Sequence, residues 1–112
     1  MFRHTISFRI DYTNPAAYDR ILRLLVAAVY LGRTADQVWD ETTSFYVIET
    51  PETSMQLAQR LIAAATLRDE DLLLVKNTNG PDAWAWGKFA NFARLKRLMP
   101  GVQLLVRAVK NR

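Results

Sequence analysis

Asp11 is the acidic residue whose position best suits chemistry. It lies at the carboxyl end of a predicted first strand, His4–Tyr12, beside the loop that leads to the first predicted helix. If two copies of the chain pack about a twofold axis, two Asp11 carboxylates could hold Mg²⁺ and activate a water against a phosphodiester. The alternative is that Asp11 forms an Asx turn before Asn14-Pro15, and spacing alone favours that alternative.

Other residue types that support catalysis or metal binding are sparse. His4 is the only histidine and there is no cysteine, so a Ser-His-Asp triad would depend on His4, and a surface histidine at the strand end is expected instead. The four glycines are scattered and form no phosphate-binding loop. The acidic run Asp69-Glu70-Asp71 could bind a hard cation, but an acidic loop before a buried strand is usually solvated.

Positive charge is concentrated at the end of the chain. Residues 1–82 carry 8 Lys/Arg and 11 Asp/Glu, whereas residues 83–112 carry 7 Lys/Arg and no acid. This asymmetry indicates an anionic partner, with RNA or DNA first. The alternative is a solvated basic face that only maintains solubility. The residues expected to contact phosphates are Lys88, Arg94, Lys96, Arg97 and Arg107.

Trp84 and Trp86 precede this basic segment and allow two interpretations. They could stack on the bases of a single strand, or they could cover the end of the sheet, which is the commoner position of a large aromatic in a small domain. The pattern AWAWG is expected to send the two rings to opposite sides. A further hypothesis places Trp84 and Trp86 with Trp39 around a small-molecule pocket.

The elements that must position these residues form one α+β domain over residues 1–112. Predicted strands cover residues 4–12, 35–39, 44–50 and 72–76. Predicted helices follow the cap-then-proline pairs Asn14-Pro15 and Thr50-Pro51. The order β-α-β-β-α-β predicts a ferredoxin-like antiparallel sheet with a core at residues 4–80.

A basic appendix is expected to follow this core over residues 83–112. It consists of a predicted helix, Lys88–Met99, and a predicted strand, Val102–Val109. A late strand on a small open sheet often pairs with the edge of another copy, so a homodimer is expected.

The second helix is expected to bury Met55 with the residues that share its face, Ala58, Leu61, Ile62 and Ala65.

No targeting or membrane segment is expected. The first residues, MFRHTISFRIDY, break their apolar character too often for a signal peptide, and no apolar run approaches the ~20 residues of a membrane span. We therefore expect no membrane partner and a cytoplasmic location.

With these elements in place, the chain resembles the SinR family of small bacterial proteins, which is related to small dimeric CRISPR-associated endonucleases and to the GhoS-type antitoxin ribonuclease. The resemblance covers about Thr5 to Phe89. It rests on Asp11 followed by Pro15 and Tyr18, and on AWAWG. The most specific part is the block TSFYVIETPETSMQLAQRLIAAATLRDEDLLLVKNTNG.

The resemblance implies a ferredoxin-like fold, a symmetric dimer, and Asp11 as the metal-dependent catalytic position. The leading hypothesis is therefore a dimeric nucleic-acid-associated protein that acts as an Mg²⁺-dependent nuclease through Asp11. The alternatives are a non-catalytic, antitoxin-like interaction module and a small-molecule-binding dimer.

Overall fold

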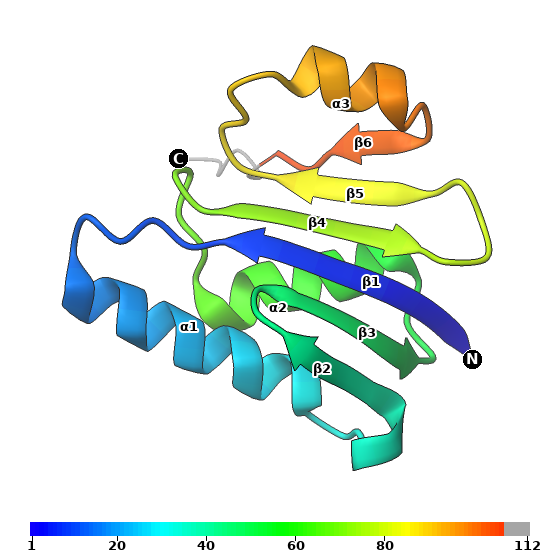
Figure 1. The fold of residues 1–112 in the computed structure, drawn as a ribbon, viewed down its shortest axis with the longest axis horizontal. Helices are drawn as coiled ribbons and strands as arrows, with labels where there is room; N and C mark the ends of the chain where they lie inside the picture. Colours follow the sequence, from blue (N-terminus) through cyan, green and yellow to red (C-terminus); the bar gives the residue numbers. More distant parts are fainter. Residues whose placement is uncertain (107–112) are drawn as a thin grey trace, which may run out of the picture.

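A sheet of six strands organises the molecule (Figure 1). The computed structural model describes residues 1–106. Its strands are β1 (Phe2–Arg9), β2 (Val38–Thr42), β3 (Phe45–Thr50), β4 (Leu72–Asn77), β5 (Ala83–Trp86) and β6 (Val102–Leu104). They lie in the order β2-β3-β1-β4-β5-β6. Neighbouring strands are antiparallel except β5 and β6, which are parallel.

The α+β class is confirmed, while the sheet is larger than the four-stranded antiparallel sheet that was predicted. The two extra strands lie beyond β4, and their parallel pairing makes the sheet mixed. β6 is the strand expected to pair with another copy; it pairs with β5 of the same chain. β6 ends at Leu104, so Leu105 and Val106 of the predicted strand are not in it, and residues 107–109 lie outside the described range.

Two long helices cover one face of the sheet. These are α1 (Pro15–Tyr30) and α2 (Ser54–Ala65). Asn14 caps α1 by accepting a hydrogen bond from the Ala17 N–H at 3.1 Å, with proline at the first helical position as predicted. A capping box between Thr53 and Gln56 starts α2. The predicted start of α2 at Thr50-Pro51 is therefore wrong: Thr50 ends β3, and the helix begins three residues later, where Thr53 and Gln56 satisfy its first N–H groups.

The main core lies between this pair of helices and the sheet. Its fully buried side chains come from every layer, for example Ile6, Leu25, Ile48, Leu61 and Val75. Met55, which was expected to face inward, is 38% exposed, and Leu57 is buried instead. None of the helices within residues 1–106 is long and apolar enough to cross a membrane.

A short third helix, α3 (Phe92–Leu98), packs on the opposite face of the sheet. It contacts Ala83 and Ala85 of β5 and Val102 of β6 through Phe92 and Leu95. Alternate β5 residues point to opposite faces, so the alanines face α3 while the tryptophans face α1 and α2. Small alanine side chains allow this helix to lie close to the sheet.

Several element boundaries differ from the prediction. β1 ends at Arg9, which leaves Asp11 in the following loop. Residues 35–37, expected to begin the second strand, form the 3-10 turn η1 (Ala35–Gln37), and β2 continues past the predicted end at Trp39 to Thr42. α3 begins four residues later than predicted because the Asn91 side chain caps it, accepting from the Arg94 N–H at 2.9 Å.

The expectation that Trp84 and Trp86 lie on opposite faces is wrong. Strand residues two apart share a face, and both rings belong to the main core, Trp86 buried and Trp84 partly buried. The Trp86 indole N–H donates to the Arg68 carbonyl at 3.1 Å. β5 is therefore a full member of the sheet whose aromatic side chains complete the main core.

Candidate nucleic-acid interface

The Asp11 carboxylate makes a local turn. Its Oδ2 accepts from the Thr13 hydroxyl at 2.6 Å and from the Thr13 N–H at 3.4 Å. This is the Asx-turn geometry that the sequence offered as the alternative to a metal site. The side chain is half-buried, and its Oδ1 accepts no hydrogen bond within residues 1–106.

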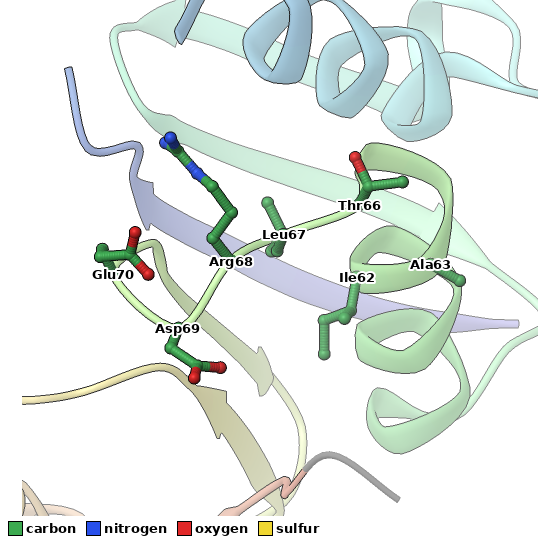
Figure 2. A pocket seen from close by; sticks show the side chains of 7 residues that line it. All are labelled: Ile62, Ala63, Thr66, Leu67, Arg68, Asp69 and Glu70. Carbon is green, nitrogen blue, oxygen red and sulfur yellow. The ribbon is translucent and has the colours of Figure 1, made fainter. Parts of the chain in front are cut away.

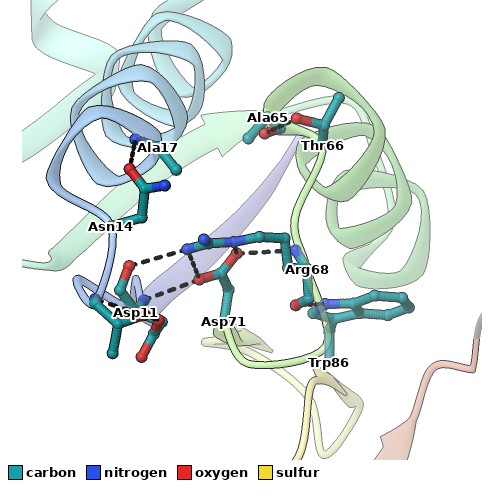
Figure 3. Close-up of polar contacts among 9 residues, drawn as sticks. Asp11, Asn14, Ala17, Ala65, Thr66, Arg68, Asp71 and Trp86 are labelled. Atoms are coloured by element: carbon teal, nitrogen blue, oxygen red, sulfur yellow. Dashed lines mark hydrogen bonds and ion pairs between the residues drawn. The ribbon is translucent and has the colours of Figure 1, made fainter.

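An ion pair between Arg68 and Asp71 lies beside Asp11 (Figure 3). Arg68 donates to the two Asp71 oxygens from Nε at 3.1 Å and from Nη2 at 2.9 Å. Two backbone N–H groups also donate to Asp71, from Arg68 at 2.8 Å and from Asp11 at 2.9 Å. Arg68 Nη2 further donates to the Asp11 carbonyl at 2.9 Å, which ties the end of β1 to the loop before β4.

This network sets the charge state of Asp71. Burial of the carboxyl would by itself raise its pKa, but the hydrogen bonds from the Arg68 side chain and from the two backbone N–H groups outweigh burial and lower the pKa from its ordinary value. The same Asp71 contact raises the pKa of Arg68. Asp71 is thus an ionised structural anchor with its oxygens already engaged.

The residues around Asp11 do not fit a magnesium site within one protomer. No group of three or more His, Asp and Glu side chains gathers anywhere in residues 1–106. Asp71 is committed to Arg68, and the Arg68 guanidinium bonds the Asp11 backbone, which places a positive charge beside the loop. One protomer supplies a single carboxylate, and further ligands would have to come from a second copy.

His4 is buried, contrary to the surface position expected for it. Its Nε2 lies 2.8 Å from the Glu52 carbonyl, and its Nδ1 has no partner. Ser54 and Asp82 lie nearby, but the Ser54 hydroxyl donates to Asp82 rather than to His4. The serine–histidine hydrogen bond that a triad needs is absent from this cluster in the described chain. The alternation of His4 with Ile6 and Phe8 was the sequence signal for burial.

The basic residues of the C-terminal segment divide into two groups. Arg94 and Arg97 are exposed and lie one turn apart on the side of α3 that faces away from the sheet. Neither forms a side-chain hydrogen bond or an ion pair within residues 1–106. Lys96, in contrast, donates to the Val102 carbonyl at 2.7 Å and holds α3 on β6.

Lys88 lies apart from this pair. The Lys88 side chain is exposed in the loop before α3, where its backbone N–H donates to the Asp69 carbonyl at 2.9 Å. Arg107 lies outside the described residues. The structure therefore presents Arg94 and Arg97 together, with Lys88 earlier in the same segment.

The proposed tryptophan pocket does not form. Trp39 lies on β2, whereas Trp84 and Trp86 lie on β5, with three strands between. A cavity of about 520 Å³ lies instead where α2 leads into β4 (Figure 2). Figure 2 shows Arg68 directed away from Ile62 and Asp69, which line this cavity.

Comparison with known proteins adds nothing to this geometry. No family model, no curated protein and no solved structure matches the chain. The resemblance to SinR-like proteins therefore stays a prediction.

Proposed function

We propose that this protein binds nucleic acid through the exposed cations of α3. The observation that carries the proposal is the pair Arg94 and Arg97, which project from the outer side of α3 without an acidic partner in residues 1–106. No Asp or Glu follows Asp82 in the sequence, so no nearby acid in this segment competes with a phosphate. Guanidinium groups suit phosphates because their planar donors match two oxygens at once.

The test is the binding of a fluorescently labelled oligonucleotide as salt is raised. Three phosphate contacts, from Lys88, Arg94 and Arg97, predict a slope of about −2 in log K against log salt for a single strand. The double variant R94E/R97E should reduce affinity at least tenfold and flatten this slope.

The matched control is R20E/R23E. Arg20 and Arg23 are also exposed and three residues apart, but they lie on α1, on the other side of the sheet. This control should retain most of the wild-type affinity. Equal losses in the two double variants would show that only net charge matters, and salt-independent or absent binding would contradict the proposal.

We also propose that the first four strands and the two long helices form a ferredoxin-like unit, to which β5, α3 and β6 are added. The neighbour order β2-β3-β1-β4 and the position of α1 and α2 on one face support this. Sheets of this kind serve many functions, so the fold alone does not identify a reaction.

A nuclease centred on Asp11 is the second candidate. The observation in its favour is the half-buried carboxylate at the end of β1, with Oδ1 left without a hydrogen bond in the described chain. It requires a homodimer, since one protomer lacks the remaining ligands. If neither binding nor cleavage is found, the non-catalytic interaction module remains as the alternative.

A further inference from the structure

One face of the sheet is only partly covered. Within residues 1–106, α1 and α2 pack on one face, and α3 covers the opposite face only over β5, β6 and the adjacent part of β4 (Figure 1). The outward residues of β1, β2 and β3 therefore have no helix above them. Among these are Thr5, Ser7, Trp39, Phe45 and Val47, which occupy strand positions alternate to the core residues.

A groove of about 290 Å³ lies where this open face meets α3. Its lining is almost entirely apolar: Ser7, Leu72 and Leu74 from the sheet, and Phe89 and Leu95 from the α3 segment. Arg9 also lines the groove, at the end of β1, and its exposed side chain has no hydrogen-bond or ion-pair partner in residues 1–106.

The side of α3 toward the groove carries further exposed groups. Leu95 lines the groove, whereas Lys96 turns toward β6 and bonds Val102. Helical geometry places Leu98 on the side opposite Lys96, between Leu95 and the outward-facing Arg94. Leu98 is 69% exposed and Arg94 is exposed as well. The groove thus has apolar walls with a cation at the strand end and another on the helix.

Two aromatic rings lie on the same face of the sheet, on the strands beyond β1. Ser7, on the floor of the groove, is the cross-strand neighbour of Phe45. The Phe45 ring lies edge-on to Trp39, with centroids 6.2 Å apart, and Trp39 is 42% exposed. The open face therefore presents, in order from α3 to β2, the apolar groove, the small residue Ser7, and the rings of Phe45 and Trp39.

We propose that this face binds a single-stranded segment of RNA or DNA, with one base in the groove and the following bases on Phe45 and Trp39. Small RNA-binding sheets of four strands stack two or three unpaired bases on exposed aromatic side chains, and such stacking tolerates any base sequence. Arg9, which lines the groove, contacts the phosphate beside that base, and Arg94, on the outer side of α3, contacts a phosphate farther along the strand. The inference rests on the proposed nucleic-acid function and specifies an unpaired strand as its ligand.

A second copy of the chain fits this face less well. At normal strand spacing and rise, the uncovered area is about 400 Å², half of the ~800 Å² that each partner of a stable interface buries. In a twofold dimer built on this face, Arg9 of one copy would meet the open face of the other copy. The acids of that patch are already engaged, Glu49 by Arg3 at 3.3 Å and Glu41 by the Trp39 indole N–H at 2.9 Å. Phosphates can satisfy Arg9 where a second copy cannot.

The experiment compares one labelled oligonucleotide as a single strand and as a blunt duplex, using fluorescence anisotropy. We expect the single strand to bind at least tenfold more tightly, because a base must leave its pair to enter the groove. Ser7→Phe, which fills the groove, and Trp39→Ala, which removes a stacking ring, should each weaken single-strand binding about tenfold. Tyr12→Ala is the control, since Tyr12 is an exposed ring outside the open face, in the loop after β1.

The outcomes separate this inference from the proposed function. If Ser7→Phe and Trp39→Ala bind like the wild type while R94E/R97E does not bind, the α3 function stands and the open-face inference is wrong. Equal affinity for single strand and duplex would also overturn it. A wild-type protein that binds neither form removes both proposals. A dimer that Trp39→Ala dissociates would assign the face to a second copy. Thermal unfolding confirms that each variant is folded.

Discussion

Asp71 carries a structural role at the scale of single residues. It is a buried carboxylate that receives two donors from the Arg68 side chain and one N–H each from the backbone of Arg68 and Asp11. Through these contacts it holds three segments together: the end of β1, the loop after α2, and the start of β4. The position of Asp11 in the fold depends on this anchor.

Asp71→Asn should therefore lower the free energy of unfolding by about 3 kcal/mol, because it leaves the Arg68 guanidinium without its charge partner. Glu70→Gln is the control, since the Glu70 side chain is exposed in the same loop. Chemical denaturation measures both. Equal effects of the two substitutions would contradict the role given to Asp71.

The same anchor predicts a pH dependence. The folded-state pKa of Asp71 is lowered from the ordinary value of 3.8. The stability it contributes is therefore fully present above about pH 5 and is lost as the pH falls through the folded pKa. The free energy of unfolding should fall below pH 4, and Asp71→Asn should lose less over that range than the wild type. If the free energy of unfolding falls equally with pH in the two proteins, Asp71 does not contribute to the acid dependence.

At the scale of elements, the loop after β5 depends on close backbone contact with the loop before β4. Gly87 has φ +112°, and a Cβ there would lie 2.1 Å from the Asp71 carbonyl oxygen. The Lys88 N–H donates to the Asp69 carbonyl on the same loop. Together these contacts fix where the chain leaves the sheet toward α3, and so where Phe89 enters the groove.

Gly87→Ala should destabilise the protein clearly more than Gly32→Ala. Gly32 also has a positive φ, +74°, but a Cβ there meets nothing within 4 Å. Gly32→Ala should lower the free energy of unfolding by about 1–2 kcal/mol, because alanine is strained at a positive φ. Gly87→Ala should cost more, because its Cβ would also clash with the Asp71 backbone. Thermal and chemical unfolding of the two variants test this. Similar losses would mean that the β5 loop tolerates displacement.

At the scale of the whole molecule, the sheet has two edges, β2 and β6, that lack a further strand within the described chain. Open edges favour pairing between copies. The expected homodimer stays a prediction, and sedimentation velocity at several concentrations checks it. A monomer at all concentrations would remove the physical basis of a nuclease built on two Asp11 residues.

Asp11→Asn separates binding from cleavage. If Asp11 is the catalytic position, Mg²⁺-dependent cleavage of a labelled RNA or DNA should disappear in this variant, while oligonucleotide affinity stays within about twofold because α3 is untouched. Asp19→Asn, an exposed carboxylate on α1, is the control. Cleavage that survives Asp11→Asn would assign the activity to another site or another protein.

The sequence by itself determined the local elements. Asn14-Pro15 starts α1 and apolar runs form β3 and β4, as predicted, whereas the start of α2 was predicted three residues too early, at Thr50-Pro51 instead of Thr53. These signals act over a few residues, so they can be read without knowledge of the rest of the fold. The concentration of cations after Asp82, and the Asx turn offered as the alternative at Asp11, also followed from sequence alone.

Only the tertiary structure decided what these elements meet. It paired Arg68 with Asp71 and Asp11, buried His4, and joined β6 to β5. It also left one sheet face open beside α3. Each of these results depends on pairing between segments far apart in the chain, and local preferences do not specify such pairing. The candidate cations could thus be predicted from sequence, whereas the groove and rings beside them could not.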